Sequence, residues 1–124
     1  MENIAIGTDI EEIKRFEGKT LEGDKFFLKK IFTPKELEYC FSNRNPAPHL
    51  CARYCAKEAV VKALSDFSIK DVYYGDIEIL NREDGSPYVI LQKYPDLKTK
   101  ISLSHCKTYA IATALIYITP FAVV

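Results

Sequence analysis

Long hydrophobic runs, net charge and glycine-rich repeats are all missing from this sequence of 124 residues. Lys+Arg and Asp+Glu are balanced at 17 each, which excludes a highly basic nucleic-acid coat protein. The five glycines are too few for a collagen-like repeat. With 48% hydrophobic and 12% aromatic residues, the chain instead has the material for the core of one domain, residues 1–124.

Two further absences bear on where the protein works. The longest nearly apolar run, Tyr109–Ile118, is about half as long as a bilayer-spanning helix. The first residues, Met1–Ile4, are polar and acidic, whereas a secretory signal has a basic start and then an apolar stretch. We therefore predict a cytoplasmic protein that binds neither a membrane nor nucleic acid.

Four cysteines raise the question of a disulfide or a zinc site. Two of them, Cys51 and Cys55, are four residues apart within a helical pattern, whereas a structural zinc site usually holds such a pair on a tight loop. In a reducing compartment we expect free thiols, mostly buried as small hydrophobic side chains. The four are Cys40, Cys51, Cys55 and Cys106.

The hydrophobic pattern predicts an α+β fold, with helices packed on a mostly antiparallel sheet. Strands are expected at Ile4–Ile10, Ile77–Leu80, Tyr88–Leu91, Ile101–Ser104 and Tyr109–Ile118. Helices are expected at Glu11–Phe16, Lys25–Phe32, Pro34–Phe41 and Leu50–Leu64.

Two local signals have a clear mechanism. Thr33 and Glu36 form a capping box at the start of a helix, with Pro34 at its first position. Asp84 and Gly85 are typical of a tight turn between two strands.

Two carboxylates lie where chemistry is plausible. Asp9 comes near the end of an apolar strand, and Glu58 lies within an alanine-rich helix. If the two met, a few hard oxygen ligands with room for water and phosphate oxygens would suit Mg²⁺. Two ordinary roles compete with this one, because Asp9 can cap the next helix and Glu58 can pair with Lys62.

Cations gather in two places. Arg53 and Lys57 share one face of the expected helix, while Lys62 lies about 140° around from Lys57. A phosphate-rich ligand across this helix would contact all three, although a solvated charged face explains them equally well. The second group would attract an acidic partner, or is simply a mixed helix surface. It contains Lys25, Lys29, Lys30 and Lys35.

Six segments, taken in order along the chain, carry a resemblance to a known family. They are Ile6–Phe16, Phe32–Leu37, Arg53–Leu64, Asp76–Ile79, Asp84–Tyr88 and Ile101–His105. The combination of the Asp9 segment with Lys57-Glu58-Ala59 is the specific part. On these segments the chain resembles the holo-acyl carrier protein synthase family, which are small bacterial-type 4′-phosphopantetheinyl transferases with a single-domain fold.

The resemblance implies a reaction. Such enzymes transfer the 4′-phosphopantetheine arm of coenzyme A to a serine of an apo acyl carrier protein in fatty-acid biosynthesis, and release 3′,5′-ADP. Asp9 and Glu58 match the family's Mg²⁺ ligands, and Lys62 completes the expected catalytic set. The proton of the serine hydroxyl would pass to Glu58 or to a metal-bound water.

The resemblance also implies the contacts to both substrates. Arg15 matches a basic residue that meets the acidic carrier protein, and family members form trimers whose active sites are shared between subunits. The expected coenzyme A contacts are Arg53, Lys57, Lys62, Pro87 and His105. The expected carrier contacts are Arg15, Lys25, Lys29 and Lys30.

One departure from the family pattern keeps alternatives open. The family usually has a glycine-rich turn after the helix that ends at Leu64, whereas this chain reads Ser65–Ser68. Backbone N–H groups of a glycine turn approach phosphate closely, and Asp66 would add a repelling charge. The alternatives are a non-catalytic relative that binds a carrier protein or nucleotide without transfer, and a purely structural trimeric module. His105 is also explained by a hydrogen-bonded turn.

Overall fold

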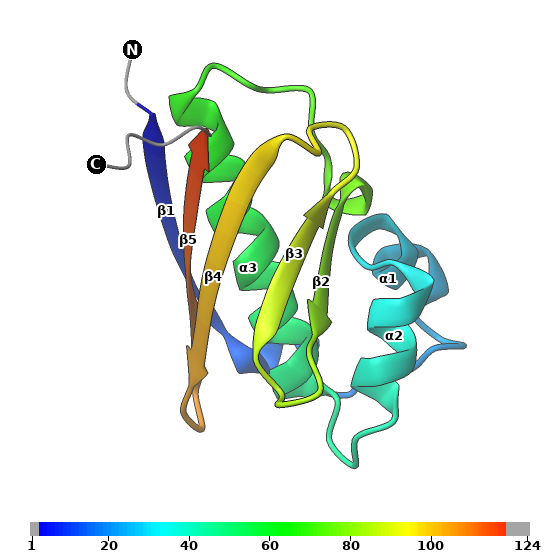
Figure 1. Ribbon diagram of the computed structural model, residues 1–124. Helices are drawn as coiled ribbons and strands as arrows, with labels where there is room; N and C mark the ends of the chain where they lie inside the picture. The colour runs from blue at the N-terminus through cyan, green and yellow to red at the C-terminus, as the bar shows by residue number, and fades with distance from the viewer. Residues whose placement is uncertain (1–2, 119–124) are drawn as a thin grey trace.

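A computed structural model describes residues 3–118, which form three α-helices, five strands and two short 3₁₀ helices (Figure 1). The α-helices are α1 (Lys25–Ile31), α2 (Pro34–Phe41) and α3 (Ala47–Asp66). The 3₁₀ helices are η1 (Ile13–Phe16) and η2 (Tyr74–Asp76). The strands are β1 (Ile4–Glu12), β2 (Ile77–Asn81), β3 (Pro87–Leu91), β4 (Leu97–His105) and β5 (Tyr109–Ile118).

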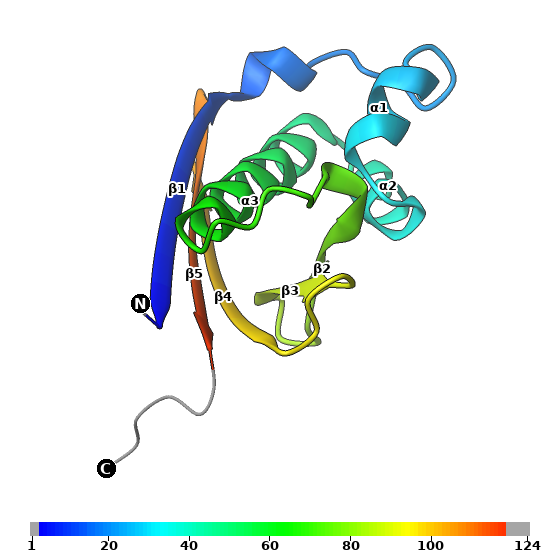
Figure 2. The same ribbon diagram turned by 90° about the horizontal axis from the view of Figure 1, so that it is seen from above.

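The α+β class and the antiparallel pairing are confirmed, but the strands form two sheets instead of one. One sheet has the order β1-β5-β4, and the other is the hairpin of β2 and β3. The predicted turn at Gly85 closes the hairpin with a φ of 89°, a left-handed conformation in which glycine has no steric penalty. Seen from above, α3 lies between the three-stranded sheet and the hairpin (Figure 2).

Gly7 brings strand β1 unusually close to α3. A Cβ atom at Gly7 would lie 2.0 Å from the backbone oxygen of Ala59 and 2.8 Å from the nitrogen of Ala63. Only glycine leaves room for this backbone-to-backbone contact. Because side chains alternate along a strand, Asp9 lies on the same side of β1 as Gly7 and therefore faces α3.

The capping box that begins α2 is confirmed. Thr33 Oγ1 accepts a hydrogen bond from the backbone N–H of Glu36 at 3.3 Å, and Glu36 Oε1 accepts one from the backbone N–H of Thr33 at 2.8 Å. One carboxylate oxygen of Glu36 therefore caps the start of α2. The other oxygen, Oε2, accepts a hydrogen bond from the N–H of Ile79 in β2 at 2.7 Å.

Several predicted boundaries differ from those of the structure. Strand β1 continues to Glu12, so the helix expected from Glu11 is reduced to η1, and the N–H of Ile13 donates to Thr108. Helix α3 is longer at both ends than predicted. Strand β4 extends to His105, which lies opposite Ala110 on the inner face of the sheet and not in a turn.

The core lies between α3 and the two sheets, and small side chains of α3 such as Ala56 and Ala59 let them approach closely. Cys40, Cys51 and Cys55 are buried free thiols, as predicted, whereas Cys106 is exposed. Among residues 3–118, no helix is long and apolar enough to cross a membrane.

Candidate functional site

Asp9 and Lys62 meet where β1 passes α3. Lys62 Nζ lies 3.2 Å from Asp9 Oδ1 and also donates to the carbonyl of Thr8 at 2.9 Å. The close contact at Gly7 explains this meeting, because Lys62 directly precedes Ala63 on the helix. Asp9 therefore pairs with α3 and does not cap the next helix.

Glu58 lies one helical turn before Lys62 but does not pair with it. Its Oε1 accepts hydrogen bonds from the hydroxyls of Tyr54 and Tyr74, each at 2.8 Å. Burial raises the pKa of both tyrosine hydroxyls, and donation to the Glu58 carboxylate raises it further. Both phenols therefore keep their protons and remain donors at neutral pH.

The two carboxylates suit a hard divalent cation. Asp9 Oδ2 is buried and has no hydrogen-bond partner within the described chain, so one anionic oxygen has no donor. Such an orphaned oxygen is costly unless a cation or another donor reaches it. Within residues 3–118, no group of three or more His, Cys, Asp or Glu side chains gathers that could hold a metal. A cation held by Asp9 and Glu58 would thus take its other ligands from water or phosphate, a coordination typical of Mg²⁺.

Lys57, one of the predicted coenzyme A contacts, is buried and paired with other groups of the protein. Its side chain is 0% exposed, and its Nζ lies 2.7 Å from Glu36 Oε1. It also donates to the carbonyls of Ile31 and Tyr74 at 2.6 and 2.8 Å. Burial lowers the pKa of Lys57, while the charge of Glu36 opposes that change. All three ammonium protons have protein acceptors, so none is left for a phosphate.

The remaining predicted coenzyme A contacts gather nearer the start of α3. Arg53 Nη2 donates to Asn81 Oδ1 at 2.8 Å, and Asn81 lies opposite Pro87 in the hairpin. Burial lowers the pKa of His49, and the charges of Arg53 and His105 lower it further. Arg53 Nε is buried without a partner in the described residues. Here too a polar atom is available to a ligand.

The predicted carrier contacts lie on η1 and α1. Arg15 is exposed, and its guanidinium carbon lies 4.7 Å from the ring centroid of Tyr54. The lysines are also exposed and surround Phe26, whose side chain is 85% exposed. These lysines are Lys25, Lys29 and Lys30.

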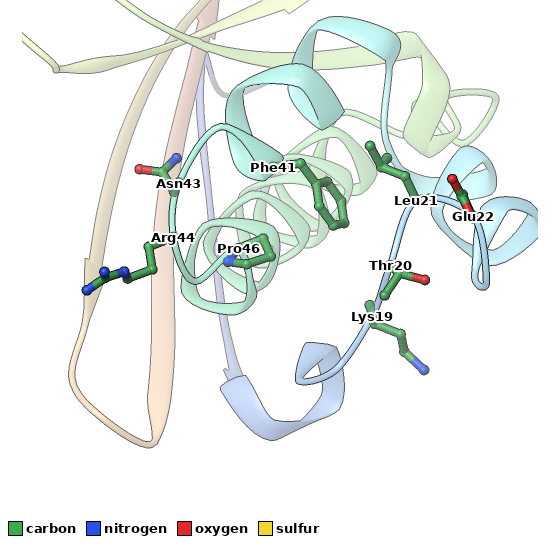
Figure 3. A pocket seen from close by; sticks show the side chains of 8 residues that line it. All are labelled: Lys19, Thr20, Leu21, Glu22, Phe41, Asn43, Arg44 and Pro46. Atoms are coloured by element: carbon green, nitrogen blue, oxygen red, sulfur yellow. The ribbon is translucent and has the colours of Figure 1, made fainter.

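A hollow of about 580 Å³ opens between the loop before α1 and the loop after α2 (Figure 3). Leu21 and Phe41 point toward one another across it, whereas Arg44 points away. None of the predicted site residues lines it, so we do not assign the site here. Its lining is Lys19, Thr20, Leu21, Glu22, Phe41, Asn43, Arg44 and Pro46.

The sequence did not reveal Tyr54, Tyr74 or Asn81 as part of these clusters. Tyr54 precedes Glu58 by four residues, and this spacing places both on one face of a helix. The spacing could therefore have indicated that Tyr54 contacts Glu58. Tyr74 approaches Glu58 from η2, and Asn81 approaches Arg53 from β2, so their positions depend on the tertiary fold.

Comparison with known proteins supplies independent information. Residues 5–114 match the model of the 4′-phosphopantetheinyl transferase superfamily. A holo-[acyl-carrier-protein] synthase of Protochlamydia amoebophila is 41% identical over 117 residues, which covers 90% of this chain and 96% of the relative. The corresponding synthase of Dehalococcoides mccartyi is 46% identical over 114 residues, or 86% of this chain and 92% of the relative.

The fold agrees with a solved structure of the same kind. A holo-(acyl-carrier-protein) synthase from Bacillus anthracis, in complex with CoA (3′,5′-ADP), superposes with a TM-score of 0.79 at 27% identity. The match covers 95% of this chain and 100% of that chain.

Proposed function

Because this chain belongs to the 4′-phosphopantetheinyl transferase superfamily, we propose that residues 1–124 are one transferase domain that acts on an apo acyl carrier protein. The reaction moves the 4′-phosphopantetheine arm of coenzyme A to a serine hydroxyl of the carrier and releases 3′,5′-ADP. The observation that carries this proposal is the Asp9–Lys62 pair across β1 and α3, one helical turn after Glu58, with one buried carboxylate oxygen of Asp9 left without a partner in the described residues.

The reaction needs negative charge to be stabilised on a diphosphate. Asp9 Oδ2 and Glu58 would hold Mg²⁺, and a bound Mg²⁺ would neutralise charge on the phosphate oxygens. Lys62, whose side chain is 56% exposed and lies beside Asp9, would supply a further positive charge to the phosphates. Positioning and charge provide most of the catalysis in phosphoryl transfer, so the chain needs no nucleophile of its own.

Coenzyme A would also contact the cluster near the start of α3. The free Nε of Arg53, with Pro87 and His105 nearby, is suited to a phosphate or a base of the nucleotide. A homotrimer with shared active sites would let this cluster of one subunit complete the Asp9–Glu58 site of its neighbour.

The outer face of the three-stranded sheet supports such an assembly. Ile6 and Ile10 of β1 are 65% and 59% exposed, and Ile10 pairs with Ile111 of β5, which is 42% exposed. Exposed apolar faces of this kind mark association sites. A trimer is expected to sediment at three times the 14.2 kDa of the chain, and Ile6→Glu should return it to the monomer.

The carrier would dock on the basic surface of η1 and α1. Arg15 lies on η1, and the three lysines of α1 share that short helix with exposed Phe26, so charge attraction and apolar contact would act together. We assign the reaction to fatty-acid biosynthesis in the cytoplasm, where buried free thiols such as those of Cys51 and Cys55 persist.

Intact mass spectrometry tests the transfer directly. An apo acyl carrier protein is incubated with this protein, coenzyme A and Mg²⁺, beside Glu58→Gln and EDTA controls. We expect the carrier to gain the mass of one phosphopantetheine arm, with turnover lowered by roughly 10² to 10⁴ in Glu58→Gln.

Two outcomes would contradict the proposal. Near wild-type rates in Glu58→Gln would show that the metal assignment is wrong. No gain on any carrier, together with coenzyme A binding by calorimetry, would favour a relative that binds without transfer.

A further inference from the structure

One oxygen of Glu58 has its hydrogen-bonding capacity filled by two tyrosines. The hydroxyls of Tyr54 and Tyr74 each lie 2.8 Å from Glu58 Oε1. An ionised carboxylate oxygen has two lone-pair sites, so two O–H donors fill Oε1. Within residues 3–118, Oε2 takes no hydrogen bond and is the oxygen available to a cation.

The two tyrosines are themselves held in place. The Tyr54 ring packs 5.7 Å from the ring of Phe16, and its hydroxyl also accepts from Arg15 Nη1 at 3.4 Å. The carbonyl of Tyr74 accepts from the buried ammonium of Lys57 at 2.8 Å. The two tyrosine rings lie 5.7 Å apart, so each limits the movement of the other. Neither hydroxyl can leave Glu58 without disturbing packed neighbours.

We infer that Tyr54 and Tyr74 are positioning residues that bind Glu58 by Oε1 and present Oε2 to the metal. This inference rests on the proposed function and adds to it the residues that orient one metal ligand. Hydrogen bonds to a ligating carboxylate fix its orientation, and loss of such partners typically weakens metal binding or activity about 10- to 100-fold. Glu58 has several side-chain torsions, so without the tyrosines it would sample orientations that do not bind the metal.

Besides pairing with Glu36, Lys57 supports the proposed metal site indirectly. The residue anchors the backbone of Tyr74, and so acts on the metal site although it contacts no ligand. Its neighbour in sequence, Glu58, projects toward the site from the next position of the same helix. Two adjacent residues of α3 thus contribute to the same site: Lys57 holds Tyr74 in place, and Glu58 would bind the metal.

The test uses Tyr54→Phe, Tyr74→Phe and the double variant, which keep both rings and remove only the hydroxyls. Mn²⁺ binding to the full chain is measured by calorimetry in the presence of coenzyme A. We expect about 10-fold weaker binding for each single variant and about 100-fold for the double variant. Turnover at saturating Mn²⁺ should stay within about threefold of the wild type, since the loss is in metal binding.

Tyr73→Phe is the matched control, because Tyr73 is 71% exposed and precedes Tyr74 directly but does not contact Glu58. Thermal unfolding by circular dichroism checks that all variants are folded. Unchanged Mn²⁺ affinity in the double variant would overturn the inference, as would an equal loss in Tyr73→Phe.

The proposed function is judged separately. If Mn²⁺ binding depends on these tyrosine hydroxyls but the wild-type protein transfers nothing, the positioning role is supported and the transferase is contradicted.

Discussion

Two lysines that lie five residues apart on α3 each pair with a carboxylate from another element. The two pairs differ in burial, in distance and in hydrogen bonding. Lys57 and Glu36 are both 0% exposed, with 2.7 Å between Nζ and Oε1. Lys62 and Asp9 are 56% and 15% exposed, with 3.2 Å between Nζ and Oδ1. The first pair has a partner for both carboxylate oxygens, whereas the second leaves Asp9 Oδ2 without one.

The difference is the one expected between a structural pair and the pair that we propose to be functional. A buried pair is tolerated only when further hydrogen bonds satisfy both ions, and Glu36 meets this condition through α2, α3 and β2. The Lys62–Asp9 pair is incomplete by the same standard, and the missing partner is what a substrate or cation would supply. The contrast also bears on Lys57, which the family resemblance indicated as a coenzyme A contact and which the fold buries against Glu36.

Removing Lys57 should have the largest effect on stability. Lys57→Met leaves the Glu36 carboxylate buried and without its counter-charge, and loss of one partner of a buried pair costs about 3 to 5 kcal/mol. Lys62→Met should change the free energy of unfolding by about 1 kcal/mol or less, because its side chain is largely exposed. Urea denaturation of both variants measures the two losses.

A second variant sharpens this comparison. Adding Glu36→Gln to Lys57→Met removes the uncompensated charge, so part of the lost stability should return. Equal losses for Lys57→Met and Lys62→Met would show that the two pairs do not differ as described.

Asp9→Asn should strongly lower activity while leaving stability nearly unchanged. The substitution removes a charge whose Oδ2 has no donor, so the free energy of unfolding should stay within about 1 kcal/mol of the wild type or rise. Transfer should fall by about 10²-fold or more, as when a single charge-stabilising group is lost. Thermal melts and the carrier mass assay together check this; a strongly destabilised Asp9→Asn would place Asp9 among structural residues.

Much of this architecture was predictable, because the signals are local. The capping box of Thr33 and Glu36, the hairpin turn at Gly85 and the strand that carries Asp9 all follow from neighbouring residues. The family resemblance then indicated Asp9 and Glu58, and Asp9 reaches α3 through its contact with Lys62, 53 residues later in the sequence.

The rest depends on the tertiary fold. Burial of Lys57 requires α2 to bring Glu36 to α3, and no helical spacing encodes that meeting. The division into two sheets depends on how the strands surround α3. The aromatic partner Tyr74 is 16 residues from Glu58 and arrives through η2, so only the folded chain reveals it.

Alkaline pH should test how well water is excluded from the surroundings of the Lys57–Glu36 pair. Cys40 is buried close to Glu36, Lys57 and Arg53, and burial raises the pKa of its thiol from 9.0 to about 12. Above pH 9 the unfolded chain releases this proton while the folded chain keeps it, so stability falls as the pH rises toward 12. The slope is about 1.4 kcal/mol per pH unit.

Urea melts of the wild type and Cys40→Ala at pH 8 and pH 10 isolate this contribution. We expect the wild type to lose about 1 kcal/mol more than the variant over that interval. Identical losses would mean that water reaches the Cys40 thiol in α2.

The smallest effect concerns the turn after α3. Ser68 has a φ of 61°, a left-handed conformation that costs a non-glycine residue about 1 kcal/mol. Ser68→Gly removes that strain but adds freedom to the unfolded chain, so the free energy of unfolding should rise by only about 0.5 kcal/mol. The backbone already adopts the shape of a glycine turn, and coenzyme A affinity measured by calorimetry should therefore change less than twofold. A large gain in affinity would instead show that the serine side chain itself keeps phosphate away.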